Sequence, residues 1–169
     1  MRLLDRAGWR TDDFSRDDLE SAIIVPFAAL QSTLETRRAH EIGVDISNNV
    51  TADELAPYFA RLTMIAIAFP AFGDGRGFSL ARRLRQAGFN GRLRAVGPLI
   101  PDQGPYAFAC GFDEIELPEA SLARQSEAQW AAALGAISHA YQPGYARPTN
   151  IFEQRRAARA PEQESRSHA

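Results

Sequence analysis

Short hydrophobic runs alternate with longer amphipathic stretches along most of the chain. A short apolar run bounded by turn residues is typical of a buried strand, whereas apolar residues at every third or fourth position are typical of a helix. The alternation predicts consecutive strand-helix units, and therefore an α/β domain with a mostly parallel sheet. Five strands are expected, at residues 22–25, 41–46, 64–69, 93–96 and 114–117.

The predicted helices have recognisable ends. Thr51 and Glu54 have the spacing of a capping box at the start of the second helix. Pro57 lies inside that helix, and we expect distortion or a late start there because proline lacks a backbone N–H. The third helix is expected to end at Gly88. The fourth crossover has room only for a short helix, and the last helix is expected over residues 121–142.

These elements place a single α/β domain at residues 20–142. We interpret residues 1–19 as an N-terminal extension. Residues 143–169 consist mainly of Arg, Ala, Gln, Glu and Ser, a composition that cannot bury enough apolar surface to fold. They are expected to form a disordered tail.

The polarity of the strands suggests an order for the sheet. Residues 22–25 and 64–69 are continuously apolar, as in strands covered on both faces. Residues 41–46 and 114–117 alternate polar with apolar, as edge strands do. This favours a flavodoxin-like or Rossmann-like three-layer sandwich with five strands in the order 2-1-3-4-5, which binds ligands between strands one and three. A half-barrel arrangement of the same units is the alternative.

A glycine-punctuated loop follows the third strand and forms the candidate site. Alternate glycines let a ligand approach the backbone, the following helix N-terminus offers unpaired N–H groups, and an arginine adds a bidentate donor. These features favour an anion or a phosphate. In the structural alternative, the Asp of this loop caps the helix or pairs with a nearby Arg. The candidate ligand-binding residues are Gly73, Asp74, Gly75, Arg76, Gly77 and Ser79.

Other polar residues are expected near this loop. Asp102 and Gln103 follow the fourth strand, and Asn48 follows the second, so all three are placed at the carboxyl edge of the sheet. Arg94 is a further candidate on the fourth strand. For Arg94 and its neighbour Arg92 we favour cross-strand pairing with Glu114 or Glu116 over a ligand role.

Composition limits the chemistry. All 19 basic residues are Arg, which excludes Schiff-base catalysis and a P-loop lysine. Cys110 is the single cysteine and is interpreted as a buried hydrophobe, and the three histidines lack a second ligand at metal spacing. No metal site is expected, and neither a cofactor nor a catalytic residue can be named. The net charge of −2 argues against nucleic acid, no apolar run is long enough for a membrane span, and a cytoplasmic location is expected.

A set of short segments is distributed over roughly residues 20–142: Ile24-Val25-Pro26, Ile65 to Pro70, Phe72 to Gly77, Ser79, Ala81-Arg82, Leu84-Arg85, Gly91, Leu93 to Gly97, Asp102-Gln103 and Cys110 to Asp113. Together they resemble a bacterial domain family of unknown function. Its members are usually described as probable oxidoreductases of sulfite reduction, encoded beside the haem-type sulfite reductase subunit in sulfur-assimilation operons. The resemblance implies a role in this pathway but no known catalytic residue.

Three hypotheses follow. In the first, the protein is an accessory of sulfite reduction that binds an anion or a phosphate-bearing ligand and has the sulfite reductase haemoprotein subunit, or another sulfur-assimilation enzyme, as a partner. In the second, it is an enzyme that uses a nucleotide cofactor at the same loop. In the third, it is a structural adaptor that docks on sulfite reductase. Since the chain has no redox group of its own, any electron transfer needs a bound cofactor or the partner's centre.

Overall fold

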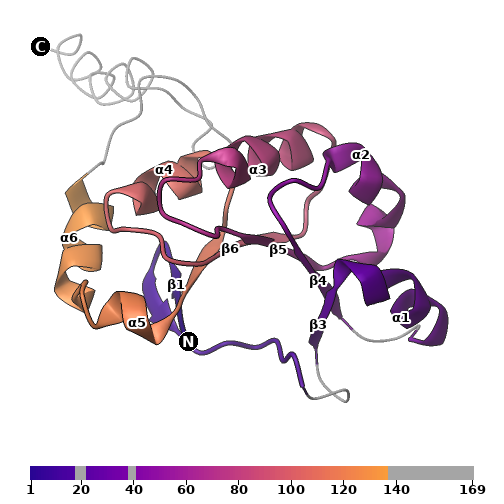
Figure 1. Cartoon of the computed structure of the whole chain (residues 1–169), viewed down its shortest axis with the longest axis horizontal. Helices are drawn as coiled ribbons and strands as arrows, with labels where there is room; N and C mark the ends of the chain where they lie inside the picture. Colours follow the sequence, from indigo (N-terminus) through magenta and orange to yellow (C-terminus); the bar gives the residue numbers. More distant parts are fainter. Residues whose placement is uncertain (18–21, 38–40, 137–169) are drawn as a thin grey trace, which may run out of the picture.

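The computed structural model describes residues 1–17, 22–37 and 41–136. Seven strands form one curved sheet, and helices cover its convex face (Figure 1). All five predicted strands are confirmed, and each boundary lies within a residue of the prediction. The strands are β1 (Arg2–Asp5), β2 (Gly8–Arg10), β3 (Ile23–Pro26), β4 (Ile42–Ile46), β5 (Met64–Ala68), β6 (Arg92–Val96) and β7 (Glu114–Leu117).

The order of the strands is β2-β1-β7-β6-β5-β4-β3, so the predicted order 2-1-3-4-5 is wrong. Strands β3 to β7 are parallel and lie side by side in chain order. Because parallel crossovers are right-handed, adding every strand on the same side places every crossover helix on the same face. The fold therefore has a single helical layer instead of a three-layer sandwich, and its parallel strands have no topological switch point.

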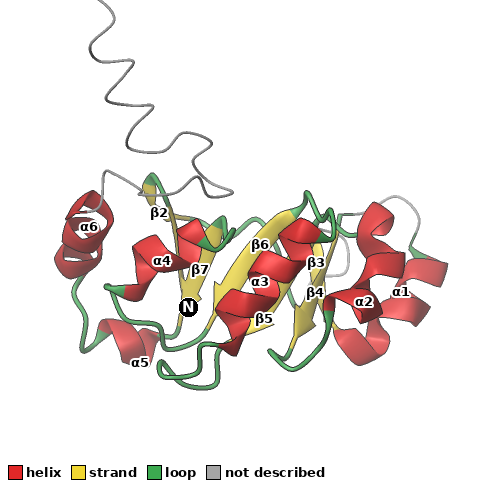
Figure 2. Cartoon of the chain, turned by 90° about the horizontal axis from the view of Figure 1, so that it is seen from above, coloured by secondary structure: helices red, strands yellow, loops and turns green. Residues whose placement is uncertain are grey.

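The helices are seen in front of the sheet in Figure 2. The predicted capping box of Thr51 and Glu54 is confirmed, and Pro57 lies at the start of a 3-10 helix. Gly88 follows the third helix with a φ of +95°, a conformation that favours glycine. The elements are η1 (Phe27–Ala29), α1 (Leu30–Thr36), α2 (Ala52–Leu55), η2 (Ala56–Arg61), α3 (Arg76–Gln86), α4 (Gln103–Ala109), α5 (Glu119–Leu122) and α6 (Glu127–Ala136).

The single last helix that we expected is two helices. The chain turns after α5, and a second capping box starts α6: the Ser126 N–H donates to Gln129 Oε1 at 2.8 Å, and the Gln129 N–H donates to Ser126 Oγ at 3.3 Å. Trp130 of α6 is fully buried. Residues 137–142, and the predicted tail, lie outside the described residues.

Apolar side chains fill the space between the sheet and its helices. Ile65, Ile67, Leu93, Ala95 and Ile115 are all fully buried there. An aromatic cluster of Phe69, Phe78 and Phe112 joins the end of β5 to α3, with ring centroids of Phe69 and Phe78 4.9 Å apart. Within the described ranges no helix is long and apolar enough to cross a bilayer.

The segment that we placed outside the domain contributes to the sheet. Residues 2–10 form the β1–β2 hairpin, and β1 pairs antiparallel with β7. The chain then crosses the concave face as an extended segment, residues 11–16, called here the strap (Figure 1). At its far end Ser15 forms a bridge to Ile23, so the strap joins the hairpin at one edge of the sheet to β3 at the other.

The two strands predicted to be edges, at 41–46 and 114–117, are interior, because β4 lies between β3 and β5 and β7 lies between β6 and β1. Their polar residues face the strap. The predicted cross-strand pairing is confirmed: Arg94 donates to Glu114 at 2.7 Å and to Glu116 at 2.9 Å. In this protein the polar alternation indicates a buried face with ion pairs instead of a solvent-exposed edge strand.

Candidate functional site

The predicted loop lies at the carboxyl end of β5, the middle strand of the parallel set. The Phe69 N–H donates to the carbonyl of Val96 at 2.7 Å and keeps the chain in the sheet for one residue beyond the strand. The chain then turns through residues 70–75 and enters α3 at Arg76. Gly73 to Ser79 therefore surround a helix N-terminus, as the sequence predicts.

Asp74 and Arg76 form a close pair at this helix end. Arg76 Nη2 donates to Asp74 Oδ2 at 2.6 Å, and its Nε and backbone N–H donate to Oδ1 at 3.0 and 3.2 Å. Hydrogen bonds from Arg76 are the main cause that holds the pKa of Asp74 far below its ordinary value, and the nearby Asn48 amide lowers it further without making a hydrogen bond of normal geometry. The Arg76 side chain is still 64% exposed. Of the two structural alternatives, the pairing of Asp74 with Arg76 is confirmed, whereas the N-cap residue of α3 is Gly75 and no side chain caps the helix.

Asn48 lies beneath this pair at the end of β4. Its side chain is nine-tenths buried, and its Nδ2 has no hydrogen-bond partner among the described residues. A buried amide group without a partner is costly. Asn48 therefore supplies a donor next to Asp74 that a bound acceptor group can satisfy.

Gln103 connects the loop to the next crossover. Its Nε2 donates to the carbonyl of Phe72 at 2.7 Å, and its Oε1 accepts from the Ile100 N–H at 3.1 Å. Asp102 precedes α4 as an exposed residue and makes no capping hydrogen bond with its side chain. The structure thus places Asn48, Gln103 and Asp102 at the same edge as the loop.

The three glycines of the loop have different roles. A Cβ at Gly77 would lie 2.4 Å from Cζ of Phe69, so this glycine allows α3 to pack on the aromatic cluster. A Cβ at Gly73 would meet nothing within 4 Å, and one at Gly75 would only touch Phe78. Only Gly73 and Gly75 leave open backbone for a ligand. Ser79 lies further along α3 and is exposed.

Arg94 does not belong to this site. It is fully buried on the concave face, where Asp12 of the strap accepts from its Nη1 and Nη2, each at 2.6 Å. Arg16 of the strap donates to both Glu116 oxygens at 3.0 and 2.9 Å and to Asp45 at 3.0 Å. Arg94 is therefore a structural residue that fastens the strap.

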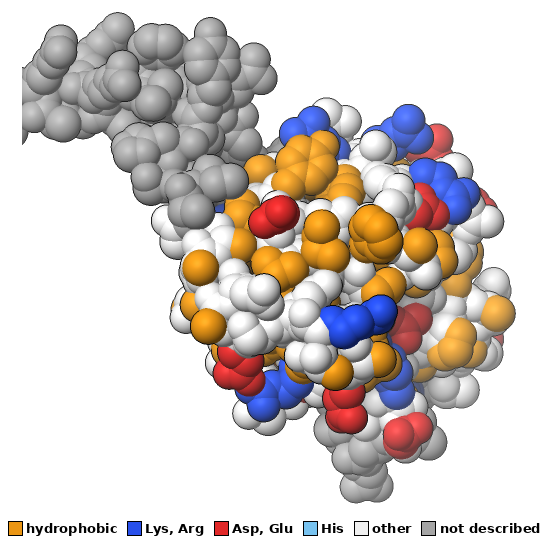
Figure 3. Space-filling model, turned by 60° about the vertical axis from the view of Figure 1, so that its left-hand side comes forward, with side chains coloured by type: hydrophobic (Ala, Val, Ile, Leu, Met, Phe, Trp, Pro, Cys, Tyr) orange, Lys and Arg blue, Asp and Glu red, His pale blue; other side chains and the backbone are white. Residues whose placement is uncertain are grey.

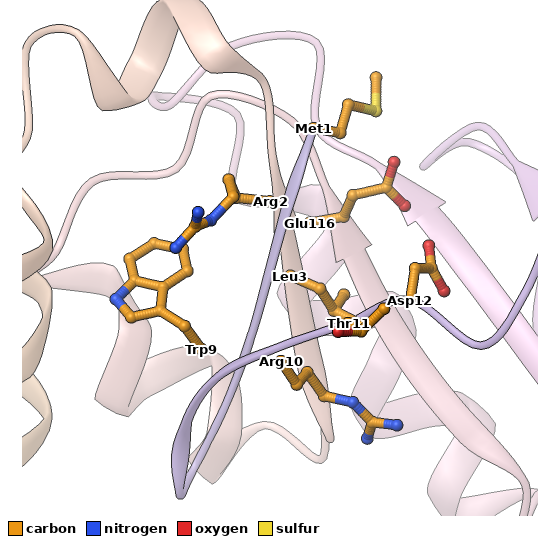
Figure 4. A pocket seen from close by; sticks show the side chains of 8 residues that line it. All are labelled: Met1, Arg2, Leu3, Trp9, Arg10, Thr11, Asp12 and Glu116. Carbon is orange, nitrogen blue, oxygen red and sulfur yellow. The ribbon is translucent and has the colours of Figure 1, made fainter.

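A cavity of about 440 Å³ lies away from the loop, between the β1–β2 hairpin and the start of the strap (Figure 4). Arg10, Asp12 and Glu116 line it, but Asp12 and Glu116 are already paired with Arg94. Arg10 lies 3.6–3.7 Å from three carboxylates. Sequence reasoning missed this cavity because the hairpin that forms it was not predicted.

Among residues 1–17, 22–37 and 41–136, no group of three or more His, Cys, Asp or Glu side chains is arranged to hold a metal ion. Cys110 is fully buried, as predicted, and burial raises the pKa of its thiol. His40, His139 and His168 lie outside the described residues.

Comparison with known families identifies the chain. Residues 43–152, well over half of it, match the family model described as bacterial protein of unknown function, DUF934. The chain belongs to this family. The matched range includes the whole candidate loop, Asn48 and Gln103, whereas the hairpin and the strap precede it. No curated protein matches the chain. The resemblance to a bacterial domain of unknown function is thus confirmed, and the family description itself names no activity or pathway.

Proposed function

We propose that this DUF934 protein is an accessory protein of assimilatory sulfite reduction that binds an anion or a phosphate-bearing ligand at residues 73–79. The pathway rests on the sequence segments that resemble the sulfite-reduction family. The ligand class rests on the site itself. The observation that carries it is the unpartnered Nδ2 of buried Asn48, next to an exposed Arg76 at the N-terminus of α3.

The donors of the loop favour negative charge. At the start of α3 the Arg76 N–H already donates to Asp74 and the Phe78 N–H to the Gly75 carbonyl. A ligand has the remaining N–H groups of the first turn and the partial positive charge of the helix dipole. Arg76 uses Nε and Nη2 on Asp74 and makes no hydrogen bond from Nη1 to the described residues. A tetrahedral oxyanion has acceptors for Nη1, the helix N–H groups and the Asn48 amide together.

Asp74 is the internal competitor of such a ligand. Its carboxylate already occupies part of the guanidinium, and its low pKa keeps it charged at any physiological pH. An arriving anion must therefore share Arg76 with it. The two residues should therefore have opposite effects on affinity. Removing the charge of Asp74 should strengthen anion binding, and removing Arg76 should weaken it.

Calorimetric titration of the full chain with inorganic phosphate, sulfite and sulfate tests the ligand class. We expect Asp74→Asn to bind phosphate more tightly than wild type and Arg76→Ala to bind it more weakly, with Gln86→Ala, an exposed position at the other end of the same helix, as the control. Equal affinities in all four proteins would overturn the anion site. Stabilisation by NADPH, FMN or a nucleotide but not by phosphate would instead favour the nucleotide-dependent enzyme, since a ligand of the native state raises its stability.

Gene deletion in the source bacterium tests the pathway separately. We expect poor growth with sulfate or sulfite as sulfur source, rescue by cysteine, and co-purification of the wild-type protein with the haem-type sulfite reductase subunit. Normal growth together with no co-purification would overturn the proposed role in sulfite reduction. The ligand site would still be tested by the titration. Rescue by Arg76→Ala as complete as by wild type, with co-purification retained, would favour the structural adaptor.

A further inference from the structure

Two aromatic side chains are exposed on the helical side of the molecule. Phe72 in the loop is 60% exposed and Tyr106 on α4 is 50% exposed. They are linked through the fold, because Gln103, one helical turn before Tyr106, donates to the carbonyl of Phe72. The Tyr106 ring also packs on Phe78 of α3 with a centroid distance of 5.0 Å. Apart from Met1, these two are the only large hydrophobic side chains among the described residues that are exposed, and both belong to the segments that Gln103 joins.

The helix α3 next to these aromatic residues is rich in arginine. The helix has four Arg and neither Asp nor Glu in its sequence. Arg85 points inward and donates to the carbonyls of Phe89, Gly91 and Gly111. Arg82 and Arg83 are exposed, and neither forms an ion pair with a described residue.

The exposed arginines of α3 differ in this respect from those of the concave face. The arginines of the strap and the concave face, such as Arg16 and Arg92, are paired with carboxylates. On the end of the molecule seen in Figure 3, acidic and basic side chains are interspersed among hydrophobic ones. The guanidinium of Arg82, in contrast, lies over the Tyr106 ring at 6.0 Å from its centroid.

We propose that the α3–α4 face, defined by Phe72, Arg82 and Tyr106 and extended by the exposed Arg83 next to Arg82 on α3, docks an acidic segment of a partner protein. Tyr and Arg are the residue types that contribute most to protein interfaces, and Phe is also enriched there. The unpaired guanidinium groups select carboxylates and speed the encounter, while the aromatic rings supply the area to be buried. The overall charge of −2 disfavours a polyphosphate chain, for which several more cations are normally required.

The test is a nitrogen-15 NMR titration of the full chain with a short synthetic peptide of Glu, Asp and Phe, beside a peptide in which Lys replaces the acidic residues. We expect the acidic peptide to shift the amides around Phe72, Arg82 and Tyr106, and added salt to weaken it. The double variant Arg82→Glu/Arg83→Glu should bind about tenfold or more weakly. Arg124→Glu, which reverses one exposed charge between α5 and α6, is the control for a charge reversal outside this face and should bind as wild type does.

Circular dichroism establishes that each variant is folded, and Tyr106→Ser provides a second loss-of-binding variant without charge reversal. The proposal is overturned if the acidic peptide shifts other amides, if the Lys peptide binds equally well, or if the double variant keeps its affinity. Tighter binding of a single-stranded oligonucleotide to the same amides would replace the protein partner by a nucleic acid. Phosphate titration of Arg82→Glu/Arg83→Glu separates this surface from the anion site, because Arg76 is unchanged in that variant.

Discussion

The two faces of the sheet bury the same strands in opposite ways. Toward the helices, β6 and β7 place Leu93, Ala95 and Ile115 in a dry apolar layer. Toward the strap, the alternate residues Arg94 and Glu114 are equally buried but charged. One face is held by apolar area, which is not directional, and the other by ion pairs, which require particular partners at particular distances.

This difference shows why polar alternation was misread. The alternation in β4 and β7 shows that one face of each strand is polar and the other apolar. A polar face can contact solvent, but it can also contact buried counterions. Here a strap of six residues supplies Asp12, Asp13 and Arg16 as counterions. A buried charge must be paired, so the strap and the sheet specify each other.

The largest effect is expected from removing the charge of Arg94, which lies at the centre of the ion pairs on the concave face. Arg94→Met should lower the free energy of unfolding by about 3–5 kcal/mol in urea titration, because Glu114, Glu116 and Asp12 lose their shared partner. Adding Glu114→Gln and Glu116→Gln to this variant should restore part of the loss. If the triple variant is no more stable than Arg94→Met, then lost packing and not uncompensated charge explains the cost.

The helical face should respond to volume instead of charge. Gly77→Ala places a methyl group against the ring of Phe69, which is itself buried in the aromatic cluster. We expect a loss of about 1–3 kcal/mol from overpacking, even though alanine favours the helix. Gly73→Ala, which faces open space, is the control and should change stability by no more than about 0.5 kcal/mol. Equal effects of both substitutions in thermal unfolding would contradict the packing account.

Acid should loosen the strap before it affects the apolar layer. Burial raises the pKa of Asp12 and Asp13, but hydrogen bonds and charge from Arg94 and Arg92 outweigh it, so both values are lowered on folding. A carboxyl whose pKa is lowered on folding stabilises the protein above its unfolded value, near 4, and loses that contribution as pH falls through the folded value. Wild type should therefore lose stability below about pH 4.

The double variant Asp12→Asn/Asp13→Asn isolates this contribution. It should be less stable than wild type at neutral pH but show a shallower decline in acid, measured as the urea midpoint at several pH values. An equally steep decline in the variant would assign the acid sensitivity to other carboxylates.

The smallest effect is expected at Cys110, which belongs to the helical face. Because burial raises the pKa of its thiol, a thiol reagent at neutral pH should label it only as fast as the chain opens. In denaturant, labelling of Cys110 should become rapid. Without denaturant, the reagent should leave the stability of the native protein unchanged. Prompt labelling of the folded protein would show that this face opens locally far more often than its packing suggests.

Some contacts of the candidate site join residues close in the sequence, and others depend on the fold. Asp74 and Arg76 are two residues apart, and their pairing was one of the alternatives written in the sequence. The approach of Asn48 and Gln103 follows from their shared position after parallel strands. Two other features could not be predicted, because they depend on the direction in which each side chain points. Gly77 packs against Phe69, and Arg94 lies on the opposite face of the sheet.

The sequence by itself determined the parallel strands, their crossover helices and most helix ends, because periodicity, proline and capping residues act within a few positions. Only the tertiary structure decided the order of the strands, the hairpin added to β7, and the strap over the charged face. Those features depend on which distant segment covers a polar surface. A pattern of alternating residues states that the surface exists but does not state what neutralises it.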